Sequence, residues 1–519
     1  MSRVLDECDK VSVDFSADPV HDLRVALRRC RSMADGVMAI DPDPDWKKMK
    51  KAGKRLFQRL GALRDIQIMK EWIEKLAAAD DRVARALPPA SSRQALPASV
   101  HSLESNGAAA NSGPSAKPLP DHTTHDPASH ALLEILSRRE VEQKREAQVA
   151  LEEFDRKQWR QWSKSLPLRA ARIRPGSSVF KHLALERWTA ARALHTRAMR
   201  NRSGVAFHTL RIGIKRFRYI VENFLPEEHK AWSRDLKQIQ DLLGDVHDLD
   251  VLWATALSCH VFPNQDSRKL WHARILQERT ERVELYRKKM AGPDSPWQVW
   301  RAALPQGKQI HAIATRRMKL WAKALDPDFA HSEHVATLAL ELYDGLAAAG
   351  LLPSTNGVDA RFSLQVAALL HDVGKSKGNK GHHKASLELI KAHGTPLGWK
   401  PEDLQRAAIV ARFHCGALPA RSHKGLRDLL PGEQKITIQL AAILRLANAM
   451  DAAHDGHIRR VYVVEPKVRA HSGKPSFVTV AADGYSVRSA TARSVAAERY
   501  LLETILHRPL MIKPSRLLT

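Results

Sequence analysis

Histidines and aspartates stand at the ends of apolar helical segments in the C-terminal part of the chain. The segment ALLHDVGK closes the apolar run 364–370 with an adjacent histidine and aspartate, followed by a glycine that fits a helix stop. Burying such groups is costly unless they are paired or bind a metal. Imidazole and carboxylate together suit Mn, Fe, Co, Ni or Zn, and carboxylate-rich sites also accept Mg. The residues with this placement are His331, His371, Asp372, Lys375, His414 and Asp451.

Other histidines nearby have competing explanations. A histidine on an apolar helix is often a hydrogen-bonded core residue, so we expect metal binding first from the adjacent His371 and Asp372. The metal and the structural explanation stay equally open for His383 and His414. Arg445 is as well explained by a structural ion pair as by a site role. We expect structural roles for His334, His382, His393 and His454.

The N-terminal part contains a pattern that occurs twice. Residues 21–31 read HDLRVALRRCR and residues 208–218 read HTLRIGIKRFR, so a histidine is followed by bases at +3, +7 and +10. These positions fall within about 80° of one helix face. A leucine–glycine pair and then an Arg-Asp or His-Asp pair follow each copy, with a lysine at the same offset before each glycine. The sequence therefore predicts an internal duplication with two equivalent cationic faces.

The charge pattern of these two faces points to a linear polyanion. A solvated basic face is the common explanation of one such stripe, but the stripes hold almost no acidic residues that would pair within the helix. Arginine suits bidentate contact with phosphate oxygens. The residues expected to bind the polyanion are His21, Arg24, Arg28, Arg29, Arg31, Lys54, Arg64, His208, Arg211, Lys215, Arg216, Arg218 and Lys237.

At this duplicated motif the chain resembles the conserved-histidine α-helical, or CHAD, domain over about residues 1–290. The resemblance implies two pseudo-symmetric helical bundles that bind inorganic polyphosphate along a basic central channel. Only twenty residues precede His21, which leaves little room for the family's first helix. We therefore expect either an incomplete first bundle or a misassigned start codon.

The ordered histidines and aspartates resemble the H…HD…D signature of the HD phosphohydrolase superfamily over about residues 315–515. The local similarity is to the helical C-terminal region of exopolyphosphatase and guanosine pentaphosphatase proteins, although the Gly-rich phosphate loops of their catalytic half are absent here. The resemblance implies that His331, His371, Asp372 and Asp451 are the primary metal ligands. It makes His383 and His414 candidates for a second metal, and Lys375 a group that stabilises phosphoryl charge.

The composition agrees with a protein that handles phosphate inside the cell. The 519 residues carry a net charge of +26, which would equally suit nucleic acid. Four scattered cysteines give no CxxC pair, which suits a reducing compartment. No apolar run approaches a membrane span, and the N-terminus lacks a signal-peptide core. We expect a cytoplasmic protein, and an association with polyphosphate granules would be compatible with it.

The predicted fold is mainly α. Helices are expected over 21–40, 46–79, 131–165, 178–200, 206–224, 229–258 and 266–290. Residues 88–130 are poor in large apolar side chains and predict a disordered insertion with four histidines, His101, His122, His125 and His130. Residues 291–314 predict a linker, 315–458 an all-helical HD domain, and 459–519 a small α+β tail with strands around a helix at 488–506.

These observations predict a polyphosphate-binding helical domain fused to an HD-type, metal-dependent phosphohydrolase. Its substrate would be polyphosphate or another phosphorylated molecule such as a nucleotide or an alarmone. The main alternative is a non-catalytic polyphosphate-binding scaffold with a vestigial HD site. A nucleic-acid-binding protein is a third alternative, but the sequence shows neither a stacking platform nor a helix-turn-helix signature.

Overall fold

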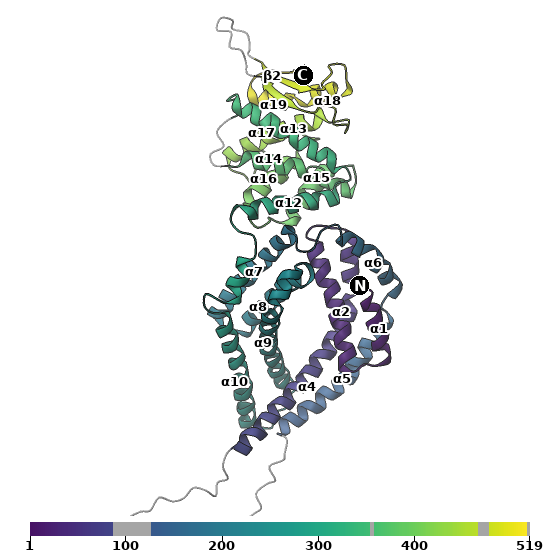
Figure 1. Ribbon diagram of the computed structural model, residues 1–519, viewed down its shortest axis with the longest axis vertical. Helices are drawn as coiled ribbons and strands as arrows, with labels where there is room; N and C mark the ends of the chain where they lie inside the picture. The colour runs from purple at the N-terminus through teal and green to yellow at the C-terminus, as the bar shows by residue number, and fades with distance from the viewer. Residues whose placement is uncertain (87–125, 353–357, 465–476, 516–519) are drawn as a thin grey trace, which may run out of the picture.

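The computed structural model describes residues 1–86, 126–352, 358–464 and 477–515, with side chains of 78–86 left aside. It is mainly helical with a small C-terminal sheet, as the sequence predicts. The molecule is elongated, with the sheet at the end farthest from the N-terminal helices (Figure 1). Within the described ranges, no helix is long and apolar enough to cross a membrane.

The predicted duplication appears as two sets of helices that pack in the same order. In the first set α1 (Arg3–Val13) packs on α2 (Ala17–Val37), α2 on α4 (Lys54–Ala86), and α4 on α5 (Pro127–Glu152). The second set repeats this order with α7 (Ser178–Asn201), α8 (Gly204–Phe224), α9 (Pro226–Ser258) and α10 (Gln265–Met290). The sets meet where α2 contacts α8 and α4 contacts α9.

Several helix boundaries differ from the prediction. The expected helix 46–79 is two helices, because Gly53 separates α3 (Pro44–Ala52) from α4, and α4 continues to Ala86. The expected helix 131–165 begins at Pro127 and divides into α5 and α6 (Arg156–Ala170), which Asp155 caps through the backbone N–H of Gln158. The expectation of an incomplete first bundle was wrong, because α1 is present and buries Val4, Cys8 and Val11.

The predicted insertion is shorter than expected at its C-terminal end. Asp126 caps α5 by accepting from the backbone N–H of Ala128, so residues 127–130, including His130, are helical. Residues 87–125, with the other three histidines of that segment, lie outside the described residues.

The predicted linker 291–314 is folded. It holds α11 (Pro296–Ala302) and the first turns of α12 (Lys308–Leu325). Trp297 and Trp300 of α11 are fully buried in the core of the N-terminal helices. The GPDSP and LPQG sequences mark the turns beside α11 correctly, but burying two indole rings stabilises the helix between them.

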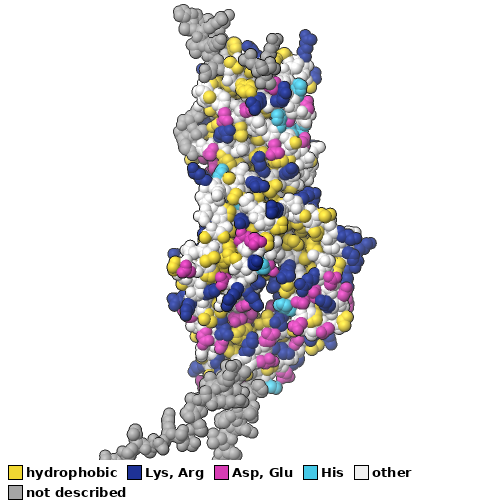
Figure 2. Space-filling model, viewed as in Figure 1, with side chains coloured by type: hydrophobic (Ala, Val, Ile, Leu, Met, Phe, Trp, Pro, Cys, Tyr) yellow, Lys and Arg dark blue, Asp and Glu magenta, His cyan; other side chains and the backbone are white. Residues whose placement is uncertain are grey.

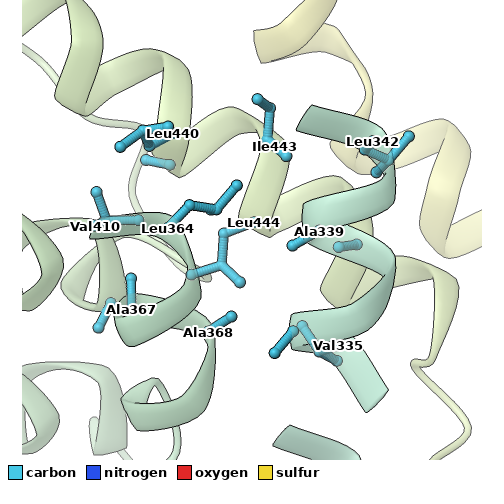
Figure 3. Close-up of a cluster of buried hydrophobic side chains, with 14 of the residues drawn as sticks. Val335, Ala339, Leu342, Leu364, Ala367, Ala368, Val410, Leu440, Ile443 and Leu444 are labelled. Carbon is cyan, nitrogen blue, oxygen red and sulfur yellow. The ribbon is translucent and has the colours of Figure 1, made fainter. Parts of the chain in front are cut away.

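The C-terminal helices surround one apolar core. Its elements are α13 (Phe329–Ala348), α14 (Ala360–Leu370), the 3-10 helix η2 (Val373–Lys377), α15 (His382–His393), α16 (Pro401–Arg412) and α17 (Pro431–Met450). Side chains from α13, α14, α16 and α17 converge in this core (Figure 3). Each fully buried leucine there, such as Leu364 or Leu444, contributes about 1.5–3 kcal/mol.

The C-terminal tail forms a three-stranded sheet with strand order β1 (Val461–Val464), β2 (Val478–Asp483), β3 (Leu510–Ser515). β1 pairs antiparallel with β2, and β3 pairs parallel with β2. The helix expected at 488–506 is two helices, α18 (Ala490–Glu498) and α19 (Tyr500–Leu506). Buried residues of all three strands belong to the same core as α13 and α17, so the tail is not a separate packing unit.

Candidate functional site

The His-Asp pair stands where α14 ends. His371 and Asp372 are both buried, and the turn of η2 follows them directly. The Nδ1–H of His371 donates to the carbonyl of Ala368 at 2.6 Å, which leaves Nε2 as the nitrogen that can accept or bind a metal. Lys375 Nζ lies 2.5 Å from Asp372 Oδ2, so the predicted phosphate-binding lysine is beside the predicted metal ligand.

Gly374 allows this turn to approach the start of α15. A Cβ at Gly374 would lie 2.0 Å from the His382 carbonyl oxygen and 2.6 Å from the Ser386 nitrogen. The Ser386 hydroxyl donates to the His371 carbonyl at 2.6 Å and accepts from the Gly374 N–H at 2.9 Å. The close approach and the two hydrogen bonds hold the first turn of α15 against the His-Asp pair.

His331 and Asp451 form a second part of the site. Both are buried, and the Nδ1 of His331 donates to Asp451 Oδ2 at 2.7 Å. Asp451 Oδ1 accepts from the backbone N–H of Gly456 at 2.9 Å. With Nδ1–H engaged, Nε2 is the His331 nitrogen available to a metal, and it lies 3.1 Å from the side-chain amide of Asn448.

The donor atoms of His331, His371 and Asp372 all lie within 4.8 Å of one another, a spacing that could hold one metal ion. Asp451 contacts His331 from behind, in the position of a carboxylate that orients a metal-binding histidine. The structure thus brings together three of the four primary ligands that the sequence predicts, and it places the fourth as a hydrogen-bond partner of the first.

A second group lies beside Asp372. His382, His414 and Cys415 also offer donor atoms within 4.8 Å of one another. His382 Nε2 is 3.3 Å from Asp372 Oδ1, and His414 Nε2 is 3.6 Å from the same oxygen. His382 and His414 thus both lie beside Asp372, whereas the sequence predicts His383 and His414 as the candidates for a second metal.

His383 lies on the other side of this group. Its Nδ1 is 3.5 Å from the sulfur of Cys415, and its ring centre is 6.5 Å from that of His414. The sequence analysis missed His382 and Cys415. The signal in the sequence was the pair His382-His383 itself, because adjacent helical residues point about 100° apart and only one can face the site.

Arg445 has a structural role in holding the loop that carries His414 and Cys415. Its buried guanidinium donates to the carbonyls of Phe413 at 3.0 Å and Gly416 at 3.1 Å, and it pairs with Glu498 at 2.7 Å. This explanation was one of the two that the sequence left open.

The electrostatics of the site favour a carboxylate surrounded by neutral imidazoles. Burial acts to raise the pKa of Asp372, but His371, His414 and Lys375 together hold it below its usual range. Burial lowers the pKa of His371 and holds that of His414 well below its usual value. Neutral imidazole and ionised carboxylate are the protonation states in which these groups bind metals.

Two buried atoms at the centre of the site, His371 Nε2 and Asp372 Oδ1, lack a hydrogen-bond partner among the residues that the structure describes. Histidine nitrogens lie close to Asp372 Oδ1, but not in a geometry that makes a hydrogen bond. An unsatisfied buried polar atom costs about 1–3 kcal/mol. The donor set and its two unpartnered atoms therefore fit a divalent metal.

In the N-terminal half, the two cationic stripes face each other across the α2–α8 contact. The guanidinium of Arg28 on α2 lies 5.9 Å from the ring centre of Tyr219 on α8. Burial lowers the pKa of Lys215 to about 7, and Arg211 of its own helix and Arg28 of the facing helix add to the shift. Like charges on two facing helices repel one another, and a bound anion would reduce this repulsion.

Some of the predicted cations are already engaged. Arg24 donates to the Gly61 carbonyl, and Arg31 donates to the Lys50 carbonyl at 2.9 Å. Three others pair with carboxylates: Arg29 and Arg218 with Glu222, and Arg64 with Glu71.

The remaining predicted cations make no ion pair with any residue that the structure describes: His21, Arg28, Lys54, His208, Arg211, Lys215, Arg216 and Lys237. The Nε of Arg211 is buried without a hydrogen-bond partner, and His208 Nδ1 lies 3.2 Å from His247 Nδ1. Arg216 lines a cavity of about 390 Å³ with Lys50, Arg187 and Tyr219. Figure 2 shows Lys and Arg side chains spread over this half of the molecule, with acidic side chains between them.

Comparison with known families agrees with this division of the chain. Residues 2–257 match the CHAD domain family, and residues 314–475 match the family described as Ppx/GppA phosphatase, domain III. No curated protein matches the chain. The chain therefore combines a CHAD domain with a region of the Ppx/GppA domain III type, a combination that suggests a polyphosphate-related protein.

Proposed function

We propose that the C-terminal half is a metal-dependent phosphohydrolase of the HD type and that the CHAD domain supplies it with polyphosphate or a related phosphate compound. The observation that carries the first part is the convergence of two unpartnered buried atoms, His371 Nε2 and Asp372 Oδ1, inside a set of histidines and beside a lysine.

Each residue of the C-terminal site has a distinct role in this proposal. His331, His371 and Asp372 hold a divalent metal, and Asp451 orients His331. A metal in such a site polarises a phosphoryl oxygen and activates water. Lys375 leaves Asp372 to neutralise charge that develops on the phosphoryl group.

The proposal for the CHAD domain is supported by its unpaired cations. Arg28, Arg211 and Lys215 come from two facing helices and form no direct ion pair among the described residues, although Asp65 and Asp248 lie close enough to interact with Arg211 and Lys215. A chain of phosphates matches the rows of cations on the two helices better than a single small phosphate ester does. Binding on the same polypeptide raises the local substrate concentration at the hydrolytic site.

The test of the hydrolase is a phosphate-release screen on the full chain. Polyphosphates of several lengths, nucleotides and alarmones are offered with added Mn, Mg, Co, Ni or Zn. We expect release from at least one substrate, and we expect Asp372→Ala to lose both metal and activity because it removes a charged ligand. Wild-type protein that holds no metal and releases no phosphate under any of these conditions would leave the scaffold alternative.

The scaffold alternative has one observation in its favour. Lys375 and His331 both have ion-pair partners inside the site, Asp372 and Asp451, as a site without a metal would also have. A catalytic site must exchange at least the Lys375 contact for substrate, so the alternative predicts polyphosphate binding without hydrolysis.

Polyphosphate binding is tested with charge reversals on the two stripes. Replacing Arg24, Arg28, Arg211 and Lys215 with Glu should abolish it. Because Arg24 also holds the Gly61 carbonyl, the double variant R28E/K215E checks that the loss is not caused by misfolding. The control R160E/K164E makes the same charge change on the exposed side of α6 and should bind like the wild type.

The salt dependence and a competitor separate polyphosphate from nucleic acid. Affinity should fall steeply with salt because each neutralised phosphate releases counterions. Duplex DNA of equal charge should compete poorly. If DNA binds as tightly as polyphosphate, and R28E/K215E weakens both equally, the nucleic-acid alternative is the better one.

A further inference from the structure

We propose that Cys415 is a metal ligand and that it completes, with His382, His414 and Asp372, a second metal position that selects a thiolate-binding ion such as Zn²⁺ or Co²⁺. The inference rests on the proposed function for the role of Asp372, which the two positions would share. It differs from the expectation drawn from the sequence, where His383 and His414 were the candidates and Cys415 had no role.

The distances between the donor atoms fit one tetrahedral ion. With Zn–N bonds of about 2.0–2.1 Å and a Zn–S bond of about 2.3 Å, tetrahedral ligand atoms lie about 3.3–3.6 Å apart. In the structure His382 Nε2 is 3.0 Å from His414 Nε2 and 3.7 Å from Cys415 Sγ. Asp372 Oδ1 is 3.3 and 3.6 Å from the two nitrogens. The donor atoms of His382, His414 and Cys415 all lie within 4.8 Å of one another, and binding would draw them closer around the ion.

The two histidines are oriented as metal ligands usually are. The Nδ1–H of His382 donates to the Asn379 carbonyl at 2.8 Å, and that of His414 donates to the Ala411 carbonyl at 2.7 Å. These bonds fix the tautomer and turn both Nε2 atoms toward the same point. Two imidazole nitrogens that face each other at 3.0 Å, with both Nδ1 atoms already donating, cannot both be satisfied by hydrogen bonds to each other.

An independent observation points to a ligand at this place. Asp372 Oδ1 is buried, has no hydrogen-bond partner within the described part of the chain, and faces the Nε2 atoms of His382 and His414. A carboxylate oxygen in this position needs a positive partner because burial of an unpaired acceptor is costly. Lys375 occupies the other oxygen, Oδ2, and leaves Oδ1 open.

His383 is the less suitable neighbour. Its ring lies 3.5 Å from the position that a Cβ on Gly416 would occupy, so it packs against the loop backbone. Its Nδ1 approaches the Cys415 sulfur at 3.5 Å, but it forms no ion pair with Asp372 in the part of the chain that the structure describes. We therefore assign it to the support of the Cys415 loop.

A thiolate at this position has a chemical consequence. Thiolate ligands favour Zn²⁺ over Mg²⁺ or Mn²⁺, which prefer oxygen donors. Binding replaces the S–H bond with a sulfur–metal bond and releases the thiol proton to solvent. The two positions would then prefer different metal ions. The first position has only nitrogen and oxygen ligands, whereas the second also has a sulfur ligand.

The test is the absorption spectrum of the full chain loaded with Co²⁺. A cysteine thiolate bound to Co²⁺ gives an intense charge-transfer band in the near ultraviolet, which nitrogen and oxygen ligands do not give. We expect this band in the wild-type protein and its loss in Cys415→Ser. Cys259→Ser is the matched control, because Cys259 is partly exposed in the N-terminal half, and it should keep the band.

The histidine variants identify the partners. His382→Asn should weaken Co²⁺ binding at this position by more than the 10–100-fold that loss of an outer-shell partner costs. His383→Asn should leave the band in place. The proposal is wrong if wild-type protein with bound Co²⁺ shows no band, or if His383→Asn removes the band while His382→Asn does not.

These outcomes are separable from those of the proposed function. Bound metal with phosphate release but without the band overturns only the thiolate ligand. A band without phosphate release from any substrate supports the second metal position and overturns the hydrolase. Melting curves of Cys415→Ser confirm that a lost band does not reflect an unfolded protein.

Discussion

Two charged side chains, one in each half of the molecule, have a lowered pKa with opposite consequences: Asp372 keeps its charge at neutral pH, and Lys215 partly loses it. In the C-terminal site, Asp372 is a buried carboxylate whose pKa is held low by His371, His414 and Lys375 despite its burial. On the CHAD surface, Lys215 is a partly buried ammonium whose pKa falls to about 7. The first arrangement favours a cation, and the second favours an anion.

Lys375 should contribute to turnover without contributing to metal binding. It lies beside the ligand Asp372 but offers no lone pair while charged. Lys375→Ala should keep the metal and slow phosphate release by about 10²-fold or more, as for other groups that stabilise transition-state charge. Lys377→Ala is the matched control, because Lys377 is exposed on the same 3-10 helix and should turn over normally. Metal loss in Lys375→Ala, measured by elemental analysis, would contradict the assignment.

Polyphosphate binding should depend on pH through Lys215. Since burial and neighbouring arginines lower its pKa to about 7, an anion that prefers the charged form takes up a proton when it binds above this pH. Affinity should therefore fall as the pH rises above about 7, by up to about tenfold per pH unit for one proton. Asp248, whose pKa burial raises to about 6, changes its charge mainly below this range, so the decline above pH 7 is assigned to Lys215.

Lys215→Arg isolates this contribution, because arginine keeps its charge at every pH used. The variant should bind at pH 7 and lose most of the decline between pH 7 and 9. Titrations of wild type and variant with one polyphosphate length would measure it. A decline equal to that of the wild type would assign the pH dependence to other groups.

At the scale of secondary-structure elements, apolar periodicity predicted most helices. The limits of α7, α8 and α10 agree with the prediction within about two residues because a buried face repeats through each of them. The breaks at Gly53 and at residues 153–155 were missed, because the apolar pattern continues across both. The choice between His382 and His383 was equally beyond the sequence, since it depends on the phase with which α15 begins.

The apolar helices also explain why the site could be located from sequence but not completed. His371 follows an apolar run that must be buried, so its neighbourhood was predictable. Cys415 belongs to a loop whose position is set by α17 and α18 through Arg445, and no local pattern records such a contact. The burial of Trp297 and Trp300 was likewise not predicted, because they stand between two turn sequences that are typical of a linker.

Arg445 should matter as a link between these elements. Arg445→Met leaves the carbonyls of Phe413 and Gly416 without their donor, and hydrogen bonds to charged groups contribute about 1.5–3 kcal/mol each. We expect a lower melting temperature and weaker Co²⁺ binding at Cys415. Glu498→Gln removes only the partly exposed ion pair, so it should cost less and keep the Co²⁺ band. Equal effects of the two variants would show that the hydrogen bonds to the two carbonyls add nothing beyond the ion pair with Glu498.

At the scale of the whole molecule, the CHAD domain and the C-terminal half meet through a buried polar network (Figure 1, where α7 approaches α12). Arg317 of α12 donates to His182 Nδ1 at 3.1 Å and pairs with Glu186 of α7 at 2.7 Å. His182 Nε2–H donates to the Leu397 carbonyl, and Glu186 accepts from the Leu397 backbone N–H. A cavity of about 780 Å³ lies beside this network, lined from both halves.

This network should contribute to stability as a unit, because Arg317 and His182 are buried, Glu186 is partly buried, and the three share partners. Arg317→Met removes the charged partner of Glu186, which keeps the Leu397 N–H, so it should cost less than about 3–5 kcal/mol, the cost for a fully buried pair. The neighbouring Arg316 is exposed on the same helix, so Arg316→Met should stay within about 0.5 kcal/mol of the wild type. Denaturant midpoints of the full chain would measure both changes.

A second substitution shows whether the cost comes from the uncompensated carboxylate. In Arg317→Met/Glu186→Gln the buried charge is gone, so part of the lost stability should return, and the double variant should be more stable than additivity of the single variants predicts. If Arg317→Met is no less stable than Arg316→Met, the two halves do not depend on this network. Their cooperation on phosphate compounds would then rest on the covalent connection through α11 and α12, and the CHAD domain would act only by raising the local substrate concentration.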